Sequence, residues 1–117
     1  MPKKKIKIAF IGCGSIHRHH MRGYLDIPDK AEVVACCDAN RPSAVASAEQ
    51  AGGAKVYTDW RKMLASEEID AVDICLPHHL HKDAILDSAK AKKHILCEKP
   101  LCLNMREARQ IEAAVKK

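Results

Sequence analysis

The chain has 117 residues, enough for one domain with a real core but few for an enzyme that must hold both a dinucleotide and a substrate. Hydrophobic residues make up 47% and aromatic residues only 3%, so the core must consist mainly of aliphatic and small side chains, as in a parallel sheet covered by helices. Four of the charges behind the net +5 are the N-terminal Lys3, Lys4, Lys5 and Lys7, and no basic stripe with interleaved aromatic residues follows them. We therefore expect no nucleic-acid partner.

Membrane and secretory classes are also excluded by the pattern. No apolar run approaches the ~20 residues of a membrane span, and no signal-peptide core follows the lysines. Cysteines lie mostly inside or at the ends of apolar stretches and never form C-x-x-C, namely Cys13, Cys36, Cys37, Cys75, Cys97 and Cys102. Such cysteines indicate buried, reduced thiols, so we expect a cytoplasmic protein.

The first half of the chain alternates strand and helix. A strand over 6–11 is broken at Gly12-Cys13-Gly14, and a helix follows to about Ile27. A second strand over 32–37 ends at Asp38, and Pro42 opens an Ala-rich helix that Gly52-Gly53 terminates.

The second half repeats the alternation. A short strand over 55–57 precedes a helix through Leu64 that Asp59 caps, and a fourth strand over 71–76 is stopped by Pro77. A helix over about 80–91, a strand over 94–97 and a last helix capped by Asn104 complete five strand–helix units. The alternation predicts an α/β fold: a Rossmann-type open parallel sheet of about five strands with helices on both faces.

A ligand crevice is expected outside the carboxyl ends of these strands. Gly12 makes the tight turn after the first strand, Gly14 lets the backbone approach a pyrophosphate, and the helix that follows offers unpaired N–H groups to the anion. The third position of the usual G-x-G-x-x-G pattern is His17, a bulky residue where close helix packing is wanted. A lone G-x-G is shared with methyltransferases and ordinary turns.

Asp38 makes the glycine turn more specific. It lies 24 residues beyond Gly14 at the end of the second strand, where a carboxylate accepts the ribose hydroxyl protons of an adenosine. The negative charge favours NAD, because a 2′-phosphate would face it. Arg41 lies near enough to contact the adenine or to accommodate that phosphate, so NADP stays open.

The sequence resembles the N-terminal dinucleotide-binding domain of the Gfo/Idh/MocA oxidoreductases, the glucose-fructose oxidoreductase and myo-inositol dehydrogenase family. The likeness covers essentially the whole chain. It depends on the segment 11–16 with His20, on 69–74 leading to Pro77 and His81, and above all on Lys93-His94-Ile95-Leu96-Cys97-Glu98-Lys99-Pro100-Leu101. The chain departs from the family pattern at His17, where a small residue is usual, and at Lys92, where glycine normally precedes the Lys-His pair. A left-handed helix cap at Lys92 would cost roughly 1 kcal/mol.

The resemblance implies hydride exchange between NAD(P) and a sugar, cyclitol or related hydroxyl compound. Lys99 is the implied catalytic residue, which hydrogen-bonds the reacting oxygen and helps to transfer its proton, and Glu98 positions Lys99 or the nicotinamide ribose. Without the resemblance, Glu98 and Lys99 can equally well be interpreted as a solvated ion pair at the end of a strand. The residues expected to bind the cofactor are Gly12, Cys13, Gly14, Ser15, Ile16, Asp38, Arg41, Leu76, Pro77, His81, Glu98 and Lys99.

In the family, a second catalytic group and the substrate pocket come from a larger domain that follows. That domain is absent from residues 1–117, which we interpret as one dinucleotide-binding domain. We therefore expect cofactor binding without turnover, a small hydroxylated substrate only with the missing domain, and self-association through the exposed flank of the sheet. The alternative is a non-catalytic nucleotide-binding or redox-sensing module that acts through a partner chain.

Histidine clusters at 17–20 and 78–81 resemble metal sites. Helical spacing does not bring adjacent histidines to one face, so we expect no metal from these runs. His20 and His81 are better interpreted as packing or cofactor contacts, and His78 or His79 as a conceivable general acid only where a substrate is held against it. We expect Trp60 to pack its helix against the sheet rather than to stack on a base.

Overall fold

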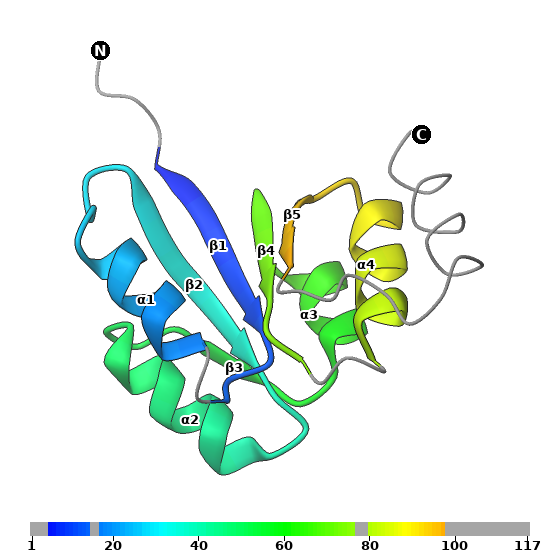
Figure 1. The fold of residues 1–117 in the computed structure, drawn as a ribbon, viewed down its shortest axis with the longest axis horizontal. Helices are drawn as coiled ribbons and strands as arrows, with labels where there is room; N and C mark the ends of the chain where they lie inside the picture. Colours follow the sequence, from blue (N-terminus) through cyan, green and yellow to red (C-terminus); the bar gives the residue numbers. More distant parts are fainter. Residues whose placement is uncertain (1–4, 15–16, 77–79, 98–117) are drawn as a thin grey trace.

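The computed structural model describes residues 5–14, 17–76 and 80–97. Within them, strands and helices alternate strictly along the chain, which confirms the predicted α/β fold (Figure 1). The last predicted helix, after Asn104, lies outside the described residues. The elements are β1 (Ile6–Ile11), α1 (His17–Leu25), β2 (Ala31–Cys37), α2 (Arg41–Gln50), β3 (Lys55–Tyr57), α3 (Trp60–Ser66), β4 (Ala71–Ile74), α4 (His81–Lys90) and β5 (His94–Cys97).

The described strands form one sheet in the order β3-β2-β1-β4-β5, and all neighbouring strands are parallel. β1 is central, and the chain turns from one side of it to the other between β3 and β4. This reversal is a topological switch point, where open parallel sheets bind their ligands at the carboxyl ends of the strands. The predicted crevice therefore falls beside Gly12.

Helices cover both faces of the sheet, and each face has its own apolar core (Figure 1). On the face of α1 and α2, Phe10, Met21 and Cys36 are fully buried. On the face of α3 and α4, Ile11, Met63, Ile74 and Ile85 are buried to the same degree. Alternate residues of β1 thus feed opposite cores, as the period of two in a strand requires.

Several predicted boundaries differ from the structure by one or two residues; α3, for example, ends at Ser66 rather than Leu64. β4 ends at Ile74 rather than Leu76, because Cys75 makes the last ladder bond, from its N–H to the carbonyl of Ile11 (2.8 Å), and the chain then leaves the sheet. α1 ends at Leu25 rather than Ile27, since the residue before Pro28 is disfavoured in helical conformation. Asp59 caps α3 as predicted, and its side chain accepts a hydrogen bond from the N–H of Arg61 (2.9 Å).

The end of α4 carries the predicted left-handed residue, for Lys92 has φ 61°. The N–H of Lys93 bonds to Ser88 O (3.1 Å) and that of Lys92 to Ala89 O (2.9 Å), which together form a Schellman motif. α2 ends in the same motif, with Gly52 (φ 87°) in the position of Lys92. The two helix ends therefore differ chiefly in whether the left-handed residue has a side chain.

We expect Lys92→Gly to raise the free energy of unfolding by about 1 kcal/mol, because glycine adopts the left-handed conformation without the clash of a Cβ atom. The reverse change, Gly52→Lys, is the matched control and should lower it by a similar amount, since nothing lies within 4 Å of a Cβ at Gly52. Urea denaturation of both variants measures the effect. A Lys92→Gly variant no more stable than the parent would contradict this view of the helix end.

Among the described residues, no helix is long and apolar enough to cross a membrane.

Candidate dinucleotide-binding site

The glycine turn after β1 is held against the end of β4. Gly12 has φ 98°, and a Cβ atom built on it would lie 2.6 Å from the carbonyl carbon and oxygen of Cys75. Both the conformation and the space therefore require glycine. At Gly14, in contrast, nothing lies within 4 Å of an added Cβ, so its lack of a side chain leaves open space beside the backbone.

Asp38 is joined directly to this turn. Its Oδ2 accepts a hydrogen bond from the N–H of Cys13 (2.8 Å), and its Oδ1 accepts one from the N–H of Asn40 (2.8 Å). Each carboxylate oxygen has a second lone pair, so both can still accept a hydrogen bond from a ligand hydroxyl. The turn after β1 and the acid after β2 thus form one hydrogen-bonded unit.

A cavity of roughly 330 Å³ opens beside this unit. It lies where β1, β2 and β4 end, at the switch point of the sheet. Its walls are mostly apolar, and Asp38 supplies a carboxylate, a composition typical of a site for a small planar ligand with a polar arm. The residues that line it are Ile11, Gly12, Gly14, Cys37, Asp38, Ala39, Thr58, Trp60, Cys75, Leu76 and Leu80.

The structure brings several of the predicted cofactor residues together. Gly12, Gly14, Asp38 and Leu76 line the cavity, and Cys13 bonds to Asp38. Arg41 is exposed at the start of α2 and is not among the lining residues. Ser15, Ile16, Pro77, Glu98 and Lys99 lie outside the described residues, and His81 is described only as the first residue of α4.

Several wall residues were not predicted from the sequence, among them Ala39, Thr58 and Leu80. Their positions just after β2, after β3 and before α4 could have identified them, because loops at the carboxyl ends of parallel strands meet at one edge of the sheet. Trp60 packs against the core of the α3–α4 face as predicted, and its Nε1–H bonds to Asp87 Oδ2 (2.7 Å). It also lines the cavity, which the sequence analysis did not anticipate.

His17 occupies the third position of the glycine pattern without opening the packing. It is only 3% exposed, and its imidazole bonds to the carbonyl of Gly14 (Nδ1 to O, 2.6 Å) and to Ser47 Oγ (Nε2 to Oγ, 2.8 Å). Its ring also meets Phe10 edge-on. His17 therefore connects α1 to the turn and to α2 through hydrogen bonds, whereas a glycine at this position would let the backbones approach closely.

The described cysteines fit the expectation of reduced thiols. Cys13, Cys36, Cys37 and Cys75 are free, and the first three of them are buried. A hydrogen bond to Cys36, together with burial, raises the pKa of Cys13, whereas that hydrogen bond lowers the pKa of Cys36. Burial, followed by nearby negative charges, raises the pKa of Cys37 to about 12, so this thiol stays protonated at physiological pH. These side chains act as small hydrophobes beside the turn.

The fold is that of a Rossmann domain, with a glycine turn and an acid hydrogen-bonded together at the switch point of the sheet. Sequence comparison gives the same class, since residues 6–117 match the Gfo/Idh/MocA model, described as the oxidoreductase family with an NAD-binding Rossmann fold. The chain belongs to this family and is its NAD-binding domain. The family resemblance drawn from the sequence is confirmed.

Comparison with individual proteins supports the assignment to this family. The chain is 37% identical to D-apiose dehydrogenase of Paraburkholderia graminis over 95% of its length, covering 29% of that protein. It is 32% identical to myo-inositol 2-dehydrogenase of Thermotoga maritima over 96% of its length, covering 33% of that protein. The WlbA dehydrogenase of Bordetella pertussis, solved with NADH and UDP-GlcNAcA, superposes with a TM-score of 0.91 at 28% identity, over 97% of this chain and 34% of that one. The chain thus spans about a third of the length of these proteins.

Proposed function

We propose that this chain is the cofactor half of a dehydrogenase that exchanges a hydride between NAD and the hydroxyl group of a sugar, cyclitol or related compound. Relatives named as D-apiose dehydrogenase and myo-inositol 2-dehydrogenase support this substrate class. The chain covers only about a third of those proteins, so we propose the reaction and its substrate for a protein that also includes a substrate domain. The bond between Cys13 N–H and Asp38 is the observation that carries the proposal, because it fixes the ribose-binding acid against the pyrophosphate turn.

The residues present fit a dinucleotide. Gly12 allows the turn to pass against Cys75, the open side of Gly14 leaves room for a pyrophosphate, and Asp38 keeps a free lone pair on each oxygen for ribose hydroxyls. When bound, the nicotinamide would supply the hydride acceptor or donor. The charge of Asp38 would oppose a 2′-phosphate, so we infer a preference for NAD over NADP, with exposed Arg41 as the nearby cation that could reduce it.

Lys99 is proposed as the catalytic residue of this half. The motif Glu98-Lys99-Pro100 follows β5, whose carboxyl end lies at the same edge of the sheet as the glycine turn. An ammonium group at that edge would hydrogen-bond the reacting hydroxyl oxygen and receive or return its proton, while Glu98 holds the lysine or the ribose. The second acid–base group would come from the substrate domain.

Replacing Lys99 by alanine should therefore separate binding from reaction. In a protein that includes the substrate domain, we expect Lys99→Ala to lower kcat at least about 100-fold, the effect of losing a general acid–base group, and to leave the NADH Kd within about twofold. Steady-state kinetics and fluorescence titration measure the two effects. Lys90→Ala, on the exposed end of α4, is the matched control and should change neither. Unchanged turnover in Lys99→Ala would refute the role.

A second candidate is a non-catalytic nucleotide-binding or redox-sensing module that acts through a partner chain. Both candidates need NAD binding, and they differ in whether the chain completes a reaction when joined to a substrate domain. For the chain alone we propose binding without turnover, and steady reduction of NAD by the isolated chain with a polyol would contradict this. Self-association through the sheet flank stays a prediction; Leu96 on β5, at the edge of the described sheet, is 52% exposed and supports it.

A further inference from the structure

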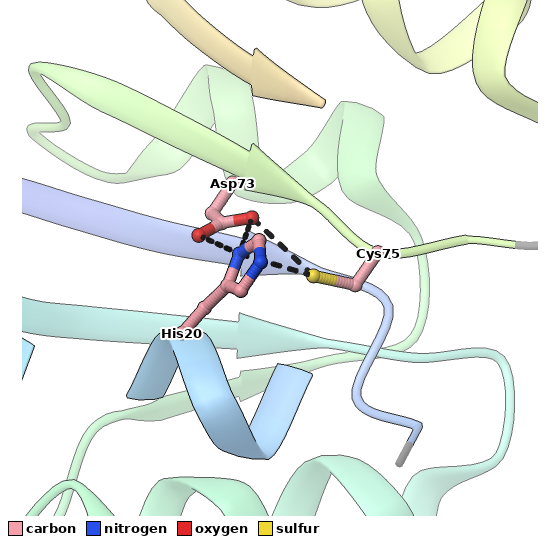
Figure 2. A group of neighbouring side chains, drawn as sticks. All are labelled: His20, Asp73 and Cys75. Carbon is pink, nitrogen blue, oxygen red and sulfur yellow. Dashed lines mark hydrogen bonds and ion pairs between the residues drawn. The ribbon is translucent and has the colours of Figure 1, made fainter. Parts of the chain in front are cut away.

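Three side chains with metal-binding atoms converge beside the glycine turn. His20 comes from α1, Asp73 from the last part of β4, and Cys75 from just after that strand; Figure 2 shows all three pointing toward one another. His20 Nδ1 lies 2.8 and 2.7 Å from the two oxygens of Asp73, and Cys75 Sγ lies 3.3 Å from Asp73 Oδ1 and 3.8 Å from His20 Nδ1. One ligand atom from each residue falls within 4.8 Å of the others.

These distances are close to those of a tetrahedral zinc site. Zn–N and Zn–O bonds of about 2.0 to 2.2 Å and Zn–S bonds of about 2.3 Å place neighbouring ligand atoms about 3.3 to 3.6 Å apart. The contacts of Cys75 Sγ with Asp73 and His20 already bracket that range. Only the imidazole and the carboxylate must separate, by about half an ångström, which a small side-chain rotation provides.

The charges of the set also suit a divalent cation. Asp73 is fully buried, and a buried carboxylate needs a compensating positive charge. A carboxylate, a thiolate and a neutral imidazole carry a total charge of −2, which a divalent ion cancels. Nitrogen, oxygen and sulfur ligands together select zinc or a similar transition metal over magnesium or calcium.

Tyr24 holds the carboxylate in place. Its hydroxyl donates a hydrogen bond to Asp73 Oδ2 (2.8 Å). Oδ2 is thereby held by the tyrosine and also lies 2.7 Å from the imidazole, while Oδ1 faces both the sulfur and the imidazole. Outer contacts of this kind orient the ligands in protein metal sites.

We propose that His20, Asp73 and Cys75 bind Zn²⁺ or a cation of similar chemistry, with Tyr24 as the positioning residue. On binding, the thiol of Cys75 releases its proton to solvent and the thiolate, the imidazole nitrogen and Asp73 Oδ1 become ligands, while an exogenous ligand such as water completes the tetrahedron. Because Cys75 also lines the dinucleotide cavity, the metal would lie next to the cofactor site without belonging to it.

Cobalt provides the test, because Co²⁺ takes the place of zinc and reports its ligands by absorption. The reduced full chain, freed of metal by a chelator, is titrated with Co²⁺ and then with Zn²⁺. We expect one equivalent of Co²⁺ to produce intense tetrahedral d–d bands and a thiolate-to-cobalt charge-transfer band, and Zn²⁺ to remove both. Cys75→Ser should abolish the charge-transfer band and weaken binding at least tenfold. Tyr24→Phe should keep the bands with about ten- to hundredfold weaker affinity.

The chain has six cysteines, so a matched control is needed. Cys36 is buried in β2 outside the cluster, and Cys36→Ala should leave the spectrum unchanged. If Cys75→Ser does not fold by circular dichroism, His20→Gln decides, and it should weaken binding at least tenfold as well. A charge-transfer band that persists in folded Cys75→Ser, or unchanged cobalt affinity in folded His20→Gln, overturns the proposal. So does a folded parent without saturable one-to-one cobalt binding, which would leave the cluster as a hydrogen-bonded network only.

Discussion

Gly12→Ala should destabilise the domain by about 4 kcal/mol. Part of the cost, about 1 to 3 kcal/mol, is backbone strain, because φ 98° at Gly12 is a conformation that alanine rarely adopts. The remainder is steric, since the new Cβ would lie 2.6 Å from the backbone carbonyl of Cys75 and 2.9 Å from the N atom of Leu76, neither of which can rotate away. A domain of this size has about 5 to 15 kcal/mol of stability in total, so the loss would be severe.

Gly14→Ala is the matched control for this change. An alanine Cβ there meets no atom within 4 Å, so we expect the free energy of unfolding to stay within about 0.5 kcal/mol. The same variant should weaken NADH binding, because the Cβ would project into the space left for the pyrophosphate. Urea denaturation of both variants makes the comparison. Equal stability of Gly12→Ala and Gly14→Ala would contradict the proposed close packing of the turn against β4.

Asp73→Ala should cost about 3 to 5 kcal/mol when it is measured in the presence of a chelator. Asp73 is fully buried and accepts hydrogen bonds from His20, from the hydroxyl of Tyr24 (2.8 Å) and from the thiol of Cys75 (3.3 Å). Its loss leaves these donors without this acceptor at a fully buried position, and breaking a buried polar pair by removing one partner has costs of this size.

Asp87→Ala tests whether burial is the cause. Asp87 also accepts hydrogen bonds, from Trp60 Nε1 (2.7 Å) and from Arg61 Nε (3.1 Å), but its side chain is 29% exposed. Water can replace the lost carboxylate, so we expect a cost of about 1 kcal/mol. Thermal or urea denaturation of the two alanine variants gives the comparison. Similar losses of stability in Asp73→Ala and Asp87→Ala would show that the burial of Asp73 does not determine the size of its effect.

The fold was predictable from sequence because its elements are locally signalled. Apolar runs that end at Gly12, Asp38 and Pro77 marked three of the strands, and parallel topology then placed their carboxyl ends together. The pairing of the glycine turn with Asp38 followed from the same logic. Their hydrogen bond through Cys13 did not, because it depends on the exact path of two loops.

Contacts between distant residues were not predictable. The single sequence gives no reason to pair His20 with Asp73, which is 53 residues away, or His17 with Ser47. Asp73 did carry a signal, because a charge in the middle of the apolar strand 71–74 must find partners when the strand is buried on both sides. The identity of those partners comes only from the packing of α1 over β4. The bulky side chain of His17 suggested a weaker match to the glycine pattern. In the structure, its imidazole is hydrogen-bonded to the carbonyl of Gly14 and to Ser47.

Titration of the folded isolated chain with NADH, NADPH and S-adenosylmethionine tests the central claim, that the glycine turn and Asp38 form an NAD site. We expect saturable one-to-one NADH binding, weaker NADPH binding and no binding of S-adenosylmethionine. Asp38→Ala should weaken NADH binding at least tenfold by removing the acceptor of the ribose hydroxyls. Asp29→Ala, exposed in the turn between α1 and β2, should not change it. Absence of saturable nicotinamide dinucleotide binding, or equal NADH affinity in Asp38→Ala, would contradict the account.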